Sequence, residues 1–293
     1  MEYKQLAEGT VLPVLGIGTW GLGGKHQADT SRDISTVDII RKAIDAGMTH
    51  IDTAEYYGAG HTEELVGEAV EPYDRGGLFI TTKVYRTHLR YQDLLSSIRN
   101  SLRRLRLDYV DLYLIHWPNP EVPLKETMGA LELCVEEGLT RFIGVSNFPL
   151  QLFQKAQSHL QSHRLIADQI YYNLTRYGKK SRIDYVTDLQ YYGVEDDIVT
   201  AFHDYCVEND IMLIAYTPLE GAKLTKPGYP VLDEIAKKYG RTPAQVALNW
   251  LVSQAKVITI PKASKIEHLR ENLGALGWRL SEKDFVRLQE SFR

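Results

Sequence analysis

The chain has 293 residues, of which 44% are hydrophobic and 25% charged, and its formal net charge is -4 at pH 7. This composition is ordinary for a globular domain and excludes a disordered or low-complexity chain. The slightly acidic balance provides no general basic surface for nucleic acid or an anionic membrane. No apolar run approaches the length of a membrane span and the N-terminus lacks a signal-peptide pattern, so we expect a cytoplasmic protein.

Short β-rich runs alternate with segments of helical spacing along the chain. Residues 3–16 predict a short hairpin that turns at Glu8 and Gly9. Helical periodicity is clearest at 37–46, 63–69, 93–105 and 124–137, and Gly47, Gly138 and Gly240 follow apolar periodic stretches as helix-stop signals. Eight strands are predicted, at residues 14–18, 49–53, 78–84, 109–116, 141–147, 165–172, 211–218 and 256–262.

Strands that alternate with helices pair in parallel, because each helix returns the chain to the same edge of the sheet. Eight such units predict one α/β domain over residues 1–293, a single (β/α)8 TIM barrel whose N-terminal hairpin plugs the bottom. A doubly wound open sheet is the competing arrangement. However, no Gly-x-Gly-x-x-Gly fingerprint follows any strand, and the glycine cluster at 21–25 has the spacing of a loop.

Two further features complete the chain-level predictions. The only cysteines, Cys134 and Cys206, have no paired spacing and are predicted to be core thiols. The polar, tyrosine-rich stretch from Arg176 to Asp197 follows the sixth strand. Because loops after barrel strands lie over the active face, we expect this loop to close over the site.

Active sites of such barrels are built at the carboxyl ends of the strands. Asp52, Lys83 and His116 end the second, third and fourth predicted strands, and Tyr57 follows just beyond the second. Each residue alone has a structural interpretation: a turn cap, a lysine reaching solvent, a hydrogen-bonded core histidine or a surface aromatic. Because adjacent strand ends converge, we expect all four side chains to form one cluster.

These four groups together suit proton transfer to a carbonyl oxygen. A tyrosine hydroxyl has an ordinary pKa of about 10, and we expect the ammonium of Lys83 to lower it. Asp52 can pair with that ammonium, and a neutral His116 can orient a substrate oxygen. Hydride is the natural partner of the donated proton, so the cluster predicts an oxidoreductase.

At these positions the sequence resembles the aldo-keto reductases. The resemblance runs from LGIGTWGLG through HIDTAEYYG, TTKV, DYVDLYLIHWP and GLTRFIGVSNF to IAYTPL and IPKASKIEHLRENL. It implies a catalytic tetrad in which Tyr57 is the general acid, Lys83 and Asp52 tune it, and His116 orients the substrate. It also implies NADPH (NADP+) as the cofactor, with NADH as an alternative, bound without a Rossmann domain.

The same resemblance implies a set of contacts around the cofactor and the substrate. Ser146, Asn147 and Gln169 match residues that hold the nicotinamide carboxamide, and Tyr216 matches the aromatic on which its ring stacks. Lys262 falls where the family places a cation on the 2'-phosphate. The implied cofactor residues are Thr19, Trp20, Asp52, Ser146, Asn147, Gln169, Tyr216, Leu219, Lys262, Ser264, His268 and Asn272, and the implied substrate-pocket residues are Trp20, Tyr56 and Trp117.

One position departs from the family pattern. The family often has an arginine six residues after the lysine, where this chain has His268. A histidine cannot make the bidentate fork of a guanidinium, so the expected preference for NADPH over NADH rests on Lys262.

Two other functions remain as alternatives. One is a cofactor-binding regulatory subunit on the same barrel with little catalysis, and the other is a glycosidase that uses Glu55 and Glu121. The main prediction is an NADP-dependent reductase of small aldehydes, ketones or sugars, acting reversibly. We expect no metal, no nucleic-acid or membrane partner, and a monomer or weak homo-oligomer.

Overall fold

The structure, a computed structural model, describes residues 1–6, 9–179, 192 and 199–293. Most of the predicted closing loop at 176–197 therefore lies outside the described residues. The strands are β1 (Tyr3–Gln5), β2 (Val11–Pro13), β3 (Ile17–Gly18), β4 (His50–Asp52), β5 (Phe79–Val84), β6 (Val110–Ile115), β7 (Thr140–Ser146), β8 (Leu165–Tyr171), β9 (Met212–Tyr216) and β10 (Val257–Thr259). The α-helices are α1 (Asp33–Asp45), α2 (His61–Val70), α3 (Tyr91–Leu105), α4 (Leu124–Glu136), α5 (Leu150–Gln157), α7 (Val199–Glu208), α8 (Pro230–Tyr239), α9 (Pro243–Ser253), α10 (Ile266–Leu273) and α11 (Glu282–Phe292).

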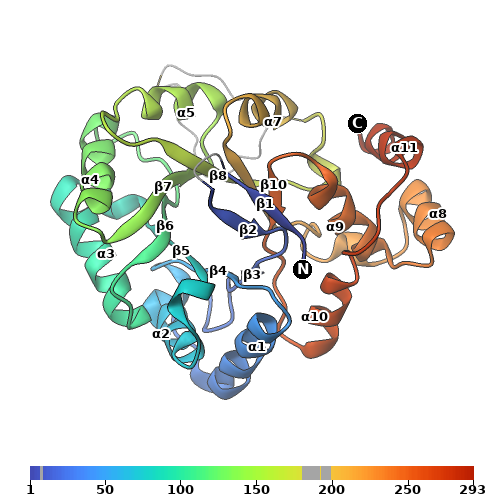
Figure 1. Cartoon of the computed structure of the whole chain (residues 1–293), viewed down its shortest axis with the longest axis horizontal. Helices are drawn as coiled ribbons and strands as arrows, with labels where there is room; N and C mark the ends of the chain where they lie inside the picture. Colours follow the sequence, from blue (N-terminus) through green and yellow to red (C-terminus); the bar gives the residue numbers. More distant parts are fainter. Residues whose placement is uncertain (7–8, 180–191, 193–198) are drawn as a thin grey trace.

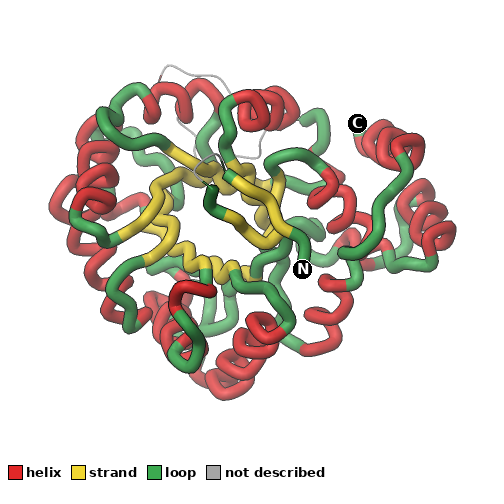
Figure 2. The backbone as a smooth tube through the Cα atoms, viewed as in Figure 1, coloured by secondary structure: helices red, strands yellow, loops and turns green. Residues whose placement is uncertain are grey.

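Strands β3 to β10 form one parallel sheet that closes on itself. Each strand pairs with the next in chain order, from β3 to β10. The two ends meet where Leu15 bridges Thr259 in parallel, and the Gly16 N–H donates to the Thr259 carbonyl over 2.9 Å. Figures 1 and 2 show the resulting ring of strands inside a ring of helices. The predicted (β/α)8 barrel is confirmed, with strands shorter than predicted at several ends.

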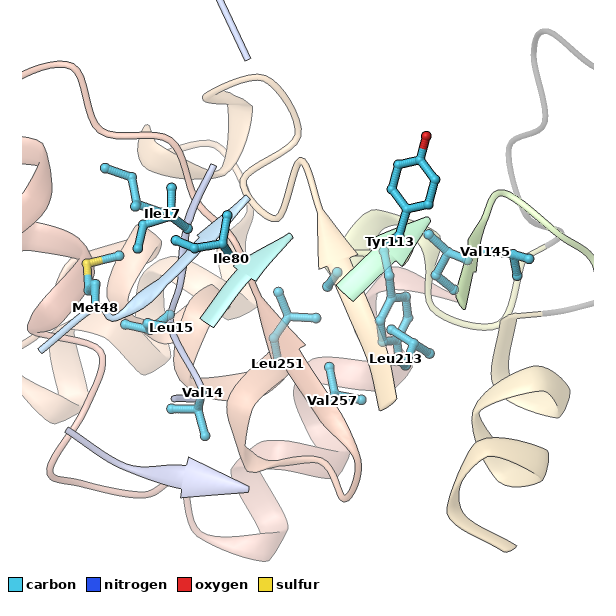
Figure 3. Close-up of a cluster of buried hydrophobic side chains, with 14 of the residues drawn as sticks. Val14, Leu15, Ile17, Met48, Ile80, Tyr113, Val145, Leu213, Leu251 and Val257 are labelled. Atoms are coloured by element: carbon cyan, nitrogen blue, oxygen red, sulfur yellow. The ribbon is translucent and has the colours of Figure 1, made fainter. Parts of the chain in front are cut away.

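Side chains along each strand alternate between the barrel interior and the helical layer. In β6, Leu112 and Leu114 belong to the inner cluster, whereas Tyr113 between them packs in the outer core. Strand β9 repeats the pattern, with Leu213 in the outer core. Figure 3 labels Tyr113 and Leu213 among the side chains of this outer core. The alternation fixes which residues at a strand's end point toward the barrel axis.

The N-terminal hairpin closes one end of the barrel. Strands β1 and β2 pair antiparallel and lie across the ring in Figure 1. Leu6 and Leu12, each 1% exposed, pack in the inner cluster with Phe79 and Met212, which begin their strands. The hairpin therefore covers the amino-terminal ends of the strands, as predicted. The Lys4 ammonium donates to the backbone carbonyls of residues 254 and 257, and burial lowers its pKa to about 7.

Several smaller predictions are also confirmed. Helices α1, α4 and α8 end just before Gly47, Gly138 and Gly240, and the glycine cluster at 21–25 lies in a loop. Cys134 and Cys206 are buried thiols, and burial raises the pKa of Cys134 to about 12. None of the helices in the described part of the chain is long and apolar enough to cross a membrane.

The hairpin contributes to stability through its inward-facing leucine. Replacing Leu12 with alanine removes a fully buried side chain and should lower the free energy of unfolding by about 2 to 5 kcal/mol. Val11 on the same strand is 50% exposed, so V11A should change the free energy of unfolding by less than about 0.5 kcal/mol. Urea unfolding of both variants measures the difference. Equal losses of unfolding free energy in the two variants would mean that the hairpin does not pack its leucine into the barrel interior.

Candidate active site

The ammonium of Lys83 is the centre of a buried polar cluster at the carboxyl end of the barrel. It donates to Asp52 Oδ1 over 2.7 Å, to the Thr53 carbonyl over 2.8 Å and to the Tyr57 hydroxyl over 3.2 Å. These three contacts use all three protons of the ammonium group. Lys83 is 0% exposed and Asp52 1% exposed. The structure therefore brings together the lysine, aspartate and tyrosine of the predicted tetrad.

Strand alternation explains why these side chains meet. Ile51 and Val84 pack in the outer core, so their neighbours Asp52 and Lys83 face the barrel interior. Ile115 is likewise in the outer core, and His116 follows it on the inner face. Asp52 and Lys83 lie at the ends of β4 and β5, and His116 directly follows the adjacent strand β6.

A tight turn carries Tyr57 back over the end of β4. The turn η2 (Tyr57–Gly60) has left-handed backbone angles at Gly58, with φ 60°, and at Ala59, with φ 53°. The Gly58 N–H donates to the Lys25 carbonyl over 2.8 Å, and a side chain at Gly58 would collide with the carbonyl oxygen of Gly23. Glycine is therefore required where the two loops touch. The turn thus brings the Tyr57 hydroxyl to Lys83 five residues after Asp52.

Burial dominates the electrostatics of the cluster. It raises the pKa of Asp52 and lowers the pKa of Lys83, while the contact between the two groups opposes both shifts. Burial and the charge of Asp52 raise the pKa of Tyr57 well above its ordinary value. The expected net lowering of this pKa is therefore wrong for the protein alone, because burial and Asp52 outweigh the effect of Lys83. Tyr57 keeps its proton, and Lys83 is placed to stabilise the oxygen once that proton leaves.

His116 presents a neutral imidazole beside Tyr57. The two ring centroids are 5.6 Å apart. The backbone N–H of His116 donates to the Val84 carbonyl over 2.9 Å. Burial and the charge of Lys83 lower the pKa of His116 well below its ordinary value. Its Nδ1 is buried without a hydrogen-bond partner among the described residues. A neutral imidazole in this position can hydrogen-bond an incoming oxygen.

A second polar network extends from Asp52 across the barrel mouth. Gln169 on β8 donates to Asp52 Oδ2 over 2.6 Å, and Ser146 donates to the Gln169 carbonyl over 2.7 Å. Asn147 donates to Ser146 Oγ over 2.9 Å and accepts from the Tyr216 hydroxyl over 2.8 Å. Amide groups and a half-buried aromatic ring side by side fit an aromatic carboxamide such as nicotinamide. Sequence reasoning grouped these residues but missed the direct contact of Gln169 with Asp52.

Aromatic rings pack in contact with Tyr57, with His116 and with one another beside the cluster. Trp20 lies edge-on to Tyr57, with centroids 4.9 Å apart, and Tyr56 stacks on Tyr85 at 4.1 Å. The predicted pocket residue Trp117 stacks on His116 at 6.4 Å. Sequence reasoning missed two residues of this aromatic group, Tyr85 and His26. Tyr85 could have been found because it directly follows the third predicted strand, and His26, whose Nδ1 is 2.9 Å from the Tyr56 hydroxyl, lies in a loop without periodic signal.

The remaining predicted cofactor residues lie in different environments. Thr19 is fully buried and donates to the Asp52 carbonyl over 2.9 Å. Lys262, Ser264 and His268 are exposed near the start of α10. Asn272 on the same helix is buried, and its amide nitrogen has no partner among the described residues. Leu219 packs against the hydrophobic core.

Comparison with known proteins identifies the family. A model described as the aldo/keto reductase family matches residues 14–292. The chain belongs to the aldo/keto reductase family. The predicted family and the predicted oxidoreductase class are thereby confirmed. No group of three or more potential metal-ligating side chains occurs among the described residues.

Individual members of the aldo/keto reductase family align over nearly all of the chain. The methylglyoxal reductase YeaE of Escherichia coli (strain K12) is 32% identical over 284 residues, which cover 96% of this chain and 91% of that protein. The thermostable aldo-keto reductase Tm1743, whose crystal structure holds the inhibitor epalrestat, is 45% identical in sequence to this chain. The two structures superpose with a TM-score of 0.88, over 99% of this chain and 100% of the Tm1743 chain. An aldo/keto reductase from Klebsiella pneumoniae, solved with NADP and acetate, is 33% identical, has a TM-score of 0.81, and covers 98% of this chain and 94% of its own.

The low pKa values of the two buried histidines predict their NMR behaviour. Burial and the charge of Lys83 lower the pKa of His50 to about 3, and they also lower that of His116. Their side-chain nitrogen shifts should therefore stay those of neutral imidazole from about pH 8 down to about pH 5, whereas an ordinary histidine titrates near 6.5. Spectra of His116→Gln and His50→Gln assign the resonances. A midpoint near 6.5 for His116 would contradict the neutral assignment.

Proposed function

We propose that this protein reduces small aldehydes, ketones or sugar carbonyls to alcohols, reversibly, with NADPH. The observation that carries the proposal is the buried contact of one ammonium group with Asp52 and Tyr57, next to a neutral His116. A proton donor, a group that stabilises its conjugate base and a substrate-orienting group are what carbonyl reduction requires of the protein.

Each residue of the cluster has a distinct role in the proposal. A nicotinamide cofactor, when bound, supplies the hydride. The Tyr57 hydroxyl gives its proton to the carbonyl oxygen, and Lys83 stabilises the resulting phenolate through its hydrogen bond. Asp52 keeps Lys83 charged and in place, while His116 orients the substrate oxygen. In the reverse direction the Tyr57 phenolate accepts the proton of an alcohol.

For the cofactor, we assign the nicotinamide end to the amide network. Ser146, Asn147 and Gln169 hold the carboxamide, and the half-buried ring of Tyr216 provides the stacking surface. Leu219, Ser264, His268 and Asn272 contact the rest of the cofactor, and Thr19 and Trp20 border it from the loop after β3. The exposed Lys262 binds the 2'-phosphate, which favours NADPH over NADH. The family relative from Klebsiella pneumoniae, which holds NADP, supports this choice.

The substrate class follows from the walls of the pocket. Trp20, Tyr56 and Trp117 give an apolar, aromatic surface around the reacting groups, which suits a small, uncharged carbonyl compound. The methylglyoxal reductase among the relatives supports a small dicarbonyl as the first substrate to test. We further propose that the chain acts as one domain in the cytoplasm, as a monomer or weak homo-oligomer.

Removing the Tyr57 hydroxyl tests the proposal. Y57F should reduce the turnover of NADPH with methylglyoxal and other small carbonyls by about 100-fold or more, because the proton donor is lost. The affinity for NADPH should change little, since the ring remains. NADPH absorbance in steady state and cofactor titration by fluorescence measure the two quantities. Y3F, at an exposed position of the hairpin, is the control and should be as active as wild type.

Other outcomes distinguish the alternatives. Cofactor binding without reduction of any carbonyl by the wild-type protein would favour the regulatory subunit. Hydrolysis of glycosides that depends on Glu55 would favour the glycosidase. That carboxylate already accepts hydrogen bonds from the Tyr85 backbone over 2.6 Å and from His88 over 3.0 Å.

A further inference from the structure

Three cations gather where the first and last strands of the barrel meet. Lys25 and Arg32 lie in the loop between β3 and α1, and Lys262 follows β10. Gly21 lies between two of them: a Cβ built on it would be 3.6 Å from Lys262 Nζ and 3.7 Å from Lys25 Cγ. Partial burial lowers the pKa of Lys262, and the positive charges of Lys25 and Arg32 lower it further. Lys25 and Arg32 therefore each repel the charge of Lys262.

Direct ion pairs do not neutralise these cations within the described part of the chain. None of the three side chains is in an ion pair with a described residue, although the protein as a whole is acidic. The charge of Arg32 helps to lower the pKa of Asp29, but the hydrogen bonds of that carboxylate come from the Ser31 backbone and hydroxyl, over 3.1 and 2.6 Å. A group of cations without ion pairs, one of them a partly desolvated ammonium, is suited to an anionic ligand.

The loop that carries two of these cations is held against the site. The Gly58 N–H donates to the Lys25 carbonyl over 2.8 Å, and the Asp29 N–H donates to the Gly23 carbonyl over 3.0 Å. His26, the next residue after Lys25, contacts the Tyr56 hydroxyl over 2.9 Å. Backbone hydrogen bonds thus hold the Lys25 main chain in place, so that its side chain starts beside Lys262.

We propose that Lys25 and Arg32 complete the binding site for the 2'-phosphate of the cofactor and replace the arginine that this chain lacks at His268. This inference rests on the proposed use of NADPH and adds residues on the opposite wall from α10. Helices α1 and α10 pack side by side and both begin at the carboxyl ends of the strands. A phosphate on Lys262 therefore lies between the start of α10, with His268, and the loop that leads into α1. The loop supplies there the cationic N–H donors that an arginine at this position of α10 would otherwise provide.

The test compares ligands that differ only in the 2'-phosphate. Dissociation constants are measured by calorimetry for NADPH and NADH, and for adenosine 2',5'-bisphosphate and adenosine 5'-phosphate, with wild type, K25A, R32A and the exposed control K237A. K25A should weaken NADPH and the bisphosphate about tenfold and R32A about threefold, with no change for NADH. K237A should match wild type. H268R combined with K25A should restore most of the lost NADPH affinity.

Two results would overturn the inference. If K25A and R32A bind NADPH with the dissociation constant of the wild type, the loop cations do not contact the ligand. Equal weakening of NADPH and NADH would show that they bind the diphosphate rather than the 2'-phosphate. In either case wild-type NADPH binding and carbonyl reduction would still stand. A wild-type protein that binds neither NADPH nor the bisphosphate would instead reject the proposed cofactor itself.

Discussion

The buried ion pair of Lys83 and Asp52 is the interaction on which the site depends. Both groups are withdrawn from water, which is unfavourable for each charge unless the other remains beside it. The remaining bonds of the pair reach Thr53, Tyr57 and Gln169, so each neighbour is positioned by the same two charges. Such a pair contributes little to net stability, but it defines one arrangement of the proton donor. Loss of either partner would leave the other buried and uncompensated.

The barrel brings this pair together through alternation and adjacency alone. Asp52, Lys83 and His116 each sit one residue from an outer-core side chain at the end of neighbouring strands. Their backbones are held by the parallel sheet, whereas Tyr57 is held by a glycine-dependent turn against the loop at Gly23. The rigid part of the site thus orients the charges, and a loop contact orients the hydroxyl that does the chemistry.

Most of the fold and the core of the site could be predicted from the sequence. Alternating strand and helix signals gave the barrel, and polar residues at strand ends gave the tetrad, because both depend on local spacing. The direction of the Tyr57 pKa could not be predicted, since it depends on the depth of burial and on which charge lies nearer. The contact of Gln169 with Asp52 joins strands far apart in the chain, and no local pattern encodes it. The cation group at Gly21 was missed for the same reason, because it joins a loop near the start of the chain to the end of the last strand.

The seam between β3 and β10 has a consequence for biosynthesis. Leu15 and Thr259 are among the first and last residues of the barrel sheet, and the Lys4 ammonium also binds the carbonyl of Val257. Neither the ring nor its plug can therefore be completed until β10 has left the ribosome. Pairing of such high sequence separation folds slowly, and the edges of the open sheet stay exposed to other chains in the meantime. A nascent chain of this protein has to protect those edges over nearly the whole of its synthesis.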